Sequence, residues 1–141
     1  MVHIAGSRAG IRRANDLFGK FSAAHHLPAG AVWPFQIALD EMLSNIVDHG
    51  GSARPRAKAK SSKAGIDIEF RLDQGVLELT IQDDAGAFDP LTAPAPDTTA
   101  PIESRPVGGL GIYLVRRLMD AVEYERKDGR NRLVCRKKIE A

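Results

Sequence analysis

Apolar residues recur at helical spacing in two stretches near the start of the chain. The first stretch lies between Ser7, which can cap a helix, and Pro28, which would end one. Its apolar face consists of Ile11, Ala14, Leu17, Phe18 and Phe21. The second stretch begins near Trp33, has Pro34 in its first turn and stops at Gly50-Gly51. Its apolar stripe consists of Phe35, Leu39, Met42 and Ile46. We therefore predict two amphipathic helices.

Alternation of apolar and charged residues predicts strands elsewhere. Residues 66–81 alternate on both sides of Asp73-Gln74-Gly75, which is a turn sequence. A second alternating region, residues 122–139, turns at Asp128-Gly129. Residues 2–4 can form a short additional strand. The sequence thus predicts two β-hairpins and one short strand.

A proline-rich segment separates the hairpins. Residues 90–106 hold five of the eight prolines, which excludes a helix or a central strand and predicts a long loop. A helix follows the glycine-rich residues 108–111 and continues to about Asp120. This order of elements fits an α/β (α+β) two-layer sandwich, in which helices cover one face of a mostly antiparallel sheet.

Composition narrows the class of protein. With 141 residues and 43% hydrophobic content, we expect one domain over residues 1–141. A net charge of +2 argues against bulk electrostatic binding of nucleic acid. The single cysteine, Cys135, excludes an internal disulfide and is expected to be buried. Without a membrane-length apolar run or a signal-peptide pattern at the start, we expect a cytoplasmic protein that binds no membrane.

The second predicted helix carries candidate chemistry. Glu41 and Asn45 lie one turn apart on the same helical face, and His49 lies one turn further. An Asn carbonyl oxygen suits Mg²⁺, and a nearby Glu can orient an attacking hydroxyl or water. Taken alone, this pattern more often marks solvated residues on an amphipathic helix.

Two further segments strengthen the interpretation. Asp83 ends a predicted strand and precedes small residues and then Phe88, so its carboxylate can accept a hydrogen bond from adenine N6 where a flat ring has room. Residues 108–111 open a helix, whose backbone N–H groups attract phosphate. Arg105, just before them, can reach a γ-phosphate. Each segment alone is typical of an ordinary turn or helix start, but the three in this order are a specific combination.

In these motifs the chain resembles the GHKL ATPase superfamily, and within it the anti-sigma-factor serine/threonine kinases of the RsbW and SpoIIAB type. Residues 41–50 match the family's N-box, residues 83–90 its first glycine box, and residues 108–120 its second. The resemblance implies a Bergerat-type ATP-binding fold with a flexible ATP lid at about residues 90–107. It also implies that Glu41 is the general base and that Asn45 binds Mg²⁺. The candidate residues for binding ATP are Asn45, His49, Asp83, Phe88, Arg105, Gly108, Gly109, Leu110 and Gly111.

The chain departs from the family pattern in two places. Ala85 stands where the pattern expects a glycine two residues after Asp83. A register that starts at Asp84 restores the glycine but brings Phe88 one position early, and we prefer Asp83 because it continues the alternation of its strand. The basic stretch at residues 54–63 is longer than a minimal connection, and it is either a partner contact or a solvated loop.

The resemblance implies an ATP- and Mg²⁺-dependent kinase that phosphorylates an antagonist protein and binds a sigma factor. Family members often act as dimers, so by analogy the resemblance also implies a homodimer. The alternative is a non-catalytic module whose nucleotide state sets its affinity for a partner. Glu41 favours the kinase, whereas Ala85 and Ala87 favour the module. The catalytic part of a histidine kinase is disfavoured, because the chain has no room for a dimerising helical hairpin. Direct DNA binding is disfavoured because no recognition helix accompanies the basic stretch.

Overall fold

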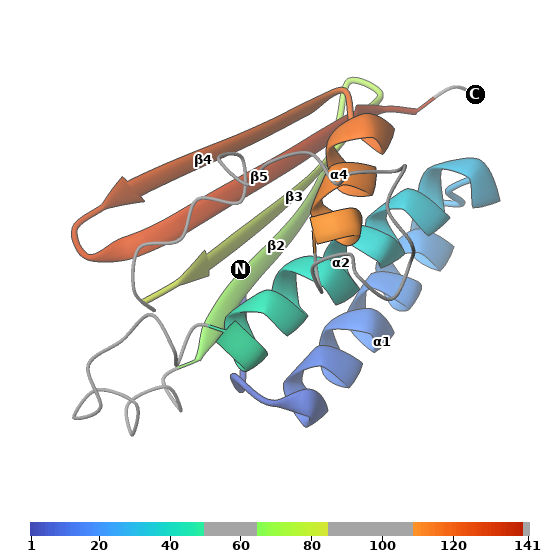
Figure 1. Ribbon diagram of the computed structural model, residues 1–141. Helices are drawn as coiled ribbons and strands as arrows, with labels where there is room; N and C mark the ends of the chain where they lie inside the picture. Colours follow the sequence, from blue (N-terminus) through green and yellow to red (C-terminus); the bar gives the residue numbers. More distant parts are fainter. Residues whose placement is uncertain (50–64, 85–108, 140–141) are drawn as a thin grey trace.

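The structure is a computed structural model that describes residues 1–49, 65–84 and 109–139. Three helices and five strands lie in these ranges (Figure 1). In chain order they are β1 (Val2–Ile4), α1 (Arg8–Ala24), α2 (Ala29–His49), β2 (Ile66–Asp73), β3 (Val76–Asp83), α4 (Gly109–Leu118), β4 (Ala121–Lys127) and β5 (Arg130–Lys138).

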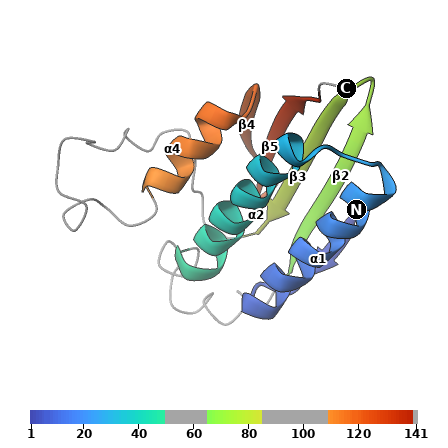
Figure 2. The same cartoon turned by 90° about the vertical axis from the view of Figure 1, so that its right-hand side faces the viewer.

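The strands form one antiparallel sheet in the order β1-β2-β3-β5-β4. All three helices lie on the same face of this sheet, with α2 between α1 and α4 (Figure 1, Figure 2). The second hairpin therefore pairs with the first through its last strand, β5, and leaves β4 at the edge. This arrangement confirms the predicted two-layer fold with helices on one face.

Both predicted hairpin turns are present. The central residues of the first turn, Gln74 and Gly75, have φ angles of 51° and 77°. Those of the second, Asp128 and Gly129, have φ angles of 54° and 75°. Two consecutive positive φ angles are the requirement of a type I′ turn, whose twist matches that of the paired strands and favours Gly at the second position. The turns therefore set the register of both hairpins.

The core lies between the helices and the sheet. Phe18 of α1 packs near Phe35 of α2 and Phe70 of β2, with ring centroids 6.1 and 5.1 Å apart, and thus joins the two layers. Leu77, Leu79 and Ile81 of β3 are all buried, as their alternation predicts. Cys135 is also buried, and burial raises the pKa of its thiol to about 12.

Two helix boundaries differ from the prediction. Helix α2 begins at Ala29 instead of near Trp33, because the carbonyl of Pro28 already accepts hydrogen bonds from the N–H groups of Ala31 and Val32. Pro34 therefore lies inside the helix and not in its first turn. Helix α4 begins at Gly109, so part of the glycine-rich segment is helical, and it ends at Leu118. The basic stretch 54–63 and the predicted loop 90–106 lie outside the described residues.

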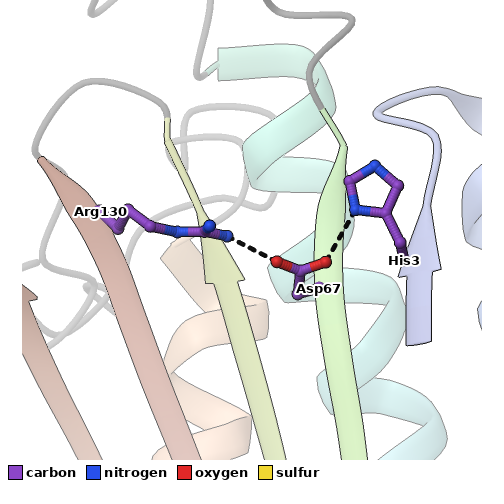
Figure 3. A network of polar contacts seen from close by, with 3 residues as sticks. All are labelled: His3, Asp67 and Arg130. Atoms are coloured by element: carbon purple, nitrogen blue, oxygen red, sulfur yellow. Dashed lines mark hydrogen bonds and ion pairs between the residues drawn. The ribbon is translucent and has the colours of Figure 1, made fainter. Parts of the chain in front are cut away.

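A polar network ties the short strand β1 to the rest of the sheet. In Figure 3, Asp67 of β2 lies between His3 of β1 and Arg130 of β5. The carboxylate accepts hydrogen bonds from His3 Nδ1 at 2.7 Å and from Arg130 Nη2 at 2.8 Å. Burial by itself would raise the pKa of Asp67, but the hydrogen bonds and charges of its two partners outweigh burial and lower that pKa.

No helix among the described residues is both long and apolar enough to cross a membrane.

Candidate functional site

Asn45 lies in the C-terminal part of α2 with its side chain turned toward the sheet. Only 8% of the residue is exposed. Its Nδ2 atom is buried and has no hydrogen-bond partner among the described residues. A buried amide without a partner is costly, since its desolvation is not compensated. A bound polar ligand would supply the hydrogen-bond acceptor that Asn45 Nδ2 lacks among the described residues.

A pocket lies between this part of α2 and the ends of β3, β4 and β5. Its empty volume, which includes space that is open to solvent, is about 350 Å³. The lining residues are Met42, Asn45, Ile46, Ile81, Asp83, Tyr124, Asn131 and Leu133. The walls are therefore mainly apolar, with a few polar groups that converge on them, which is the usual composition of a small-molecule site.

Asp83 brings a carboxylate to this pocket. It is 5% exposed, whereas its neighbour Asp84 is exposed, because successive residues of a strand point to opposite faces. The side chain that points inward is the one in register with Leu79 and Ile81. This placement supports the preferred match of Asp83 to the first glycine box.

Asn131 orients the carboxylate of Asp83. The two residues are directly opposite each other on β3 and β5, and Asn131 Nδ2 donates a hydrogen bond of 3.1 Å to Asp83 Oδ1. The other end of the amide, Asn131 Oδ1, accepts hydrogen bonds from the Tyr124 hydroxyl and from Arg126 Nη1. With two donors on its oxygen, the amide nitrogen is held toward Asp83.

Asn131 and Tyr124 were not predicted to be site residues from the sequence. A signal was present, because Asn131 precedes Leu133 by two residues and so lies on the core-facing side of its strand. A polar residue at a core-facing position next to a strand end indicates either a structural hydrogen bond or a site. The pairing of β5 with β3 places Asn131 opposite Asp83, and this pairing was needed to identify Asn131 as a neighbour of the candidate site.

Glu41 contacts a different element, the first turn of α4. A methyl group added at Gly111 would fall on the Glu41 carboxylate. Only a residue without a side chain therefore lets α4 approach α2 this closely while the carboxylate keeps its position. Among the glycines of residues 108–111, Gly111 is the one whose surroundings the structure describes.

The structure thus brings together several of the predicted site residues. Asn45 and Asp83 line one pocket, and Glu41 lies one helical turn from Asn45 and against Gly111. His49 is the last residue of α2, and Gly109 and Leu110 begin α4. The remaining predicted residues, Phe88, Arg105 and Gly108, lie outside the described residues, as do the side chains of His49 and Leu110.

The described residues contain no group of three or more His, Cys, Asp and Glu side chains that could hold a metal ion. Mg²⁺ seldom needs such a cage, because it keeps several waters and is bound through one or two protein groups and the phosphates of a nucleotide. Asn45 fits that pattern in its chemistry, since it lines the pocket and its side chain carries one amide oxygen, a ligand type that suits Mg²⁺.

Comparisons with known proteins find a matching domain family and several related protein kinases. A model of the histidine kinase-like ATPase domain matches residues 5–137. The serine/threonine-protein kinase BtrW of Bordetella bronchiseptica is 33% identical over 97 residues, which cover 69% of this chain and 63% of that protein. The serine-protein kinases RsbW of Bacillus mycoides and Bacillus thuringiensis are each 31% identical over 98 residues, covering 67% of this chain and 56% of theirs. The aligned region is therefore less than two thirds of each relative.

Proposed function

This chain belongs to the histidine kinase-like ATPase domain family, and we propose that it is an ATP- and Mg²⁺-dependent serine/threonine protein kinase that regulates a partner protein. The observation that carries the proposal is the convergence of two buried polar side chains, Asp83 and Asn45, on one mainly apolar pocket. The Nδ2 atom of Asn45 has no hydrogen-bond partner in the part of the chain that the structure describes. Its similarity to proteins named serine or serine/threonine kinases supports the reaction class.

The adenine ring would occupy the pocket. Met42, Ile46, Ile81 and Leu133 offer apolar walls for a flat ring. Asp83 would accept a hydrogen bond from the exocyclic amine, while Asn131 holds the carboxylate in place through its 3.1 Å hydrogen bond. A guanine would present a carbonyl oxygen at that position, and two acceptors would then face each other. The arrangement favours adenine for this reason.

The phosphates would lie toward Asn45 and the start of α4. The amide oxygen of Asn45 suits Mg²⁺, which when bound neutralises phosphate charge. The first N–H groups of α4, from Gly109 to Gly111, are not bonded within the helix and can donate to phosphate oxygens. Gly111 leaves room at this point for both the helix and the Glu41 carboxylate.

Glu41 would act as the general base. As the hydroxyl oxygen of a serine or threonine of the partner bonds to the γ-phosphorus, the bond from that phosphorus to its bridging oxygen breaks and ADP leaves. The hydroxyl proton passes to the Glu41 carboxylate. Positioning and electrostatic stabilisation supply most of the rate enhancement in such reactions.

By resemblance, the partners are a sigma factor and an anti-sigma antagonist protein in the cytoplasm. The substrate hydroxyl belongs to the antagonist protein. One domain over residues 1–141, with a lid at about residues 90–107, belongs to the same proposal. The second candidate is a nucleotide-responsive binding module without transfer, which Ala85 and Ala87 favour because they depart from the family's sequence pattern.

Calorimetric titration with ATP and ADP, with and without Mg²⁺, tests the nucleotide site. Asn45→Ala is expected to abolish the Mg²⁺-dependent part of ATP binding, and Asp83→Asn to weaken binding of both nucleotides by about tenfold or more, roughly 1.4 kcal/mol. Asp84→Asn is the matched control, because Asp84 is an exposed neighbour of the same type. Absence of binding at millimolar nucleotide would contradict the proposal.

Transfer of radiolabelled γ-phosphate to candidate antagonist proteins separates the kinase from the module. Glu41→Ala is expected to remove transfer while ATP binding persists. A parent protein that binds ATP but transfers no phosphate to any candidate would instead support the binding module.

A further inference from the structure

Helix α2 carries two neighbouring stripes of polar residues. Glu41 and Asn45, with position 49, form the stripe of the proposed site. The residue before each of them, Asp40, Ser44 and Asp48, forms a second stripe. Because successive residues differ by about 100° around a helix, the second stripe faces a different neighbour. A contact that holds the second stripe therefore also restrains the rotation of α2 about its axis. That rotation decides where the side chains of the first stripe point.

All three residues of the second stripe make polar contacts with α1. Arg8 Nη2 lies 2.8 and 2.7 Å from the two carboxylate oxygens of Asp48. Arg8 Nη1 also donates a longer hydrogen bond of 3.5 Å to Ser44 Oγ. Further along the same helix, Asn15 Nδ2 donates to Asp40 Oδ1 at 2.9 Å. Residues of α1 therefore hold both ends of the second stripe of α2.

Arg8 is well anchored at its own backbone. It is the first residue of α1, after the cap Ser7, whose hydroxyl accepts a hydrogen bond from the Gly10 N–H at 3.3 Å. A methyl group at Gly10 would collide with the Ala5 carbonyl, so the first turn of α1 is packed directly against the preceding chain. A guanidinium on this fixed turn is a firm point of attachment for the last turn of α2.

The charges of Arg8 and Asp48 have unusual signs for their positions at the ends of α1 and α2. A cation at a helix N-terminus and an anion near a helix C-terminus both oppose the helix dipole. Arg8 and Asp48 occupy these unfavourable positions and are 62% and 37% exposed. An exposed ion pair contributes little to overall stability. Global stability therefore does not account for this pair.

We propose that Arg8 and Asn15 are positioning residues that fix the rotation of the last turns of α2 and so aim Asn45 at Mg²⁺-bound nucleotide. This inference rests on the proposed function of Asn45. The two-pronged contact of Arg8 with Asp48 has the greater effect, because Asp48 is only three residues from Asn45.

The first test uses nucleotide-free protein. In nitrogen-15 NMR spectra, Arg8→Ala is expected to shift the side-chain amide signals of Asn45 and to speed hydrogen exchange of backbone amides in the last turn of α2. Arg12→Ala is the matched control, since Arg12 is an exposed arginine on the same helix. Unchanged Asn45 signals in Arg8→Ala would overturn the proposal, whether or not the protein binds nucleotide.

The second test is the ratio of ATP affinities with and without Mg²⁺. Arg8→Ala is expected to weaken binding of Mg²⁺-ATP by about three- to tenfold, and Mg²⁺-free ATP by much less, because Asn45 acts through the metal. An equal loss in both would indicate a general loss of structure and would also overturn the proposal. If the parent binds no nucleotide, the proposed function fails, and the NMR result alone decides whether Arg8 fixes the rotation of the last turns of α2.

The charge-swapped variant Arg8→Asp/Asp48→Arg provides a rescue. It keeps an ion pair between the two helix ends and places each charge at its favourable end. Recovery of most of the Mg²⁺-ATP affinity lost in Arg8→Ala supports a positioning role for the contact between residues 8 and 48. Failure to recover that affinity, in a variant at least as heat-stable as the parent, contradicts this role.

Discussion

At the scale of single residues, the site depends on polar groups whose directions are fixed by their neighbours. Asn131 shows this most directly, because Tyr124 and Arg126 occupy its oxygen and leave its nitrogen to Asp83. A free Asp83 side chain could rotate and offer its oxygens in several directions. The hydrogen-bonded one is restricted before any ligand arrives, which lowers the entropy lost on binding.

We predict that Asn131→Ala weakens both stability and ATP binding. The substitution leaves a buried carboxylate oxygen and a tyrosine hydroxyl without this partner, which should cost about 1–3 kcal/mol of unfolding free energy. ATP affinity should fall by roughly three- to tenfold as the restraint on Asp83 is lost. Urea denaturation and calorimetry measure the two effects. Arg132→Ala, at an exposed neighbouring position, should change neither. Full ATP affinity in Asn131→Ala would show that Asp83 needs no orientation.

At the scale of elements, the approach of α4 to α2 links the start of one helix to a side chain of the other. The Glu41 carboxylate lies where the Cβ of any other residue at position 111 would be. The obstructing atoms are the end of a flexible side chain, so a larger residue can be accommodated if the carboxylate moves. The contact is therefore more important for the position of Glu41 than for folding.

Gly111→Ala is thus expected to separate catalysis from stability. The unfolding free energy should change by less than about 1 kcal/mol, since the carboxylate can rotate away. Under the proposed function, phosphoryl transfer should fall by at least tenfold, about 1.4 kcal/mol, because Glu41, as the proposed base, would be displaced from the substrate hydroxyl. Gly19→Ala is the control, because a methyl group there meets nothing within 4 Å. Undiminished transfer by Gly111→Ala would remove Glu41 from the role of base.

Sequence patterns were sufficient for the elements but not for every boundary. The hairpins were predictable because period-two alternation and Gly-containing turns are local properties, as at Gln74-Gly75. The start of α2 was not, because the hydrogen bonds accepted by the Pro28 carbonyl outweigh the usual placement of Pro34 in a first turn. Asp83 and Asn45 were recognisable from motifs. Asn131 was not, since its partner comes from cross-strand pairing over a distance of 48 residues.

At the scale of the whole molecule, stability at low pH depends on contacts that join distant strands. Asp67 connects β1, β2 and β5 through His3 and Arg130 (Figure 3). Its pKa is lower in the folded protein, so the unfolded chain binds the proton more readily. The resulting stabilisation is present above the unfolded pKa of about 3.9 and disappears as the pH falls through the lower folded value.

Asp67→Asn should therefore be less stable than the parent at pH 7, and the difference should shrink as the pH is lowered below about 4. Urea denaturation at pH 7, 5 and 3 measures it. Asp73→Asn serves as a control, because Asp73 lies at the exposed end of the same strand. A stability difference that stays constant across this pH range would contradict the linkage.

The order of strands has a consequence for how another protein can bind. The two outer strands are the only edges of the described sheet: β1 has three residues, and β4 carries Glu123, Glu125, Arg126 and Lys127, all exposed. Short edges and charged edges resist pairing with a strand from another chain. A protein that associates with this molecule is therefore not expected to extend its sheet by pairing with an outer strand.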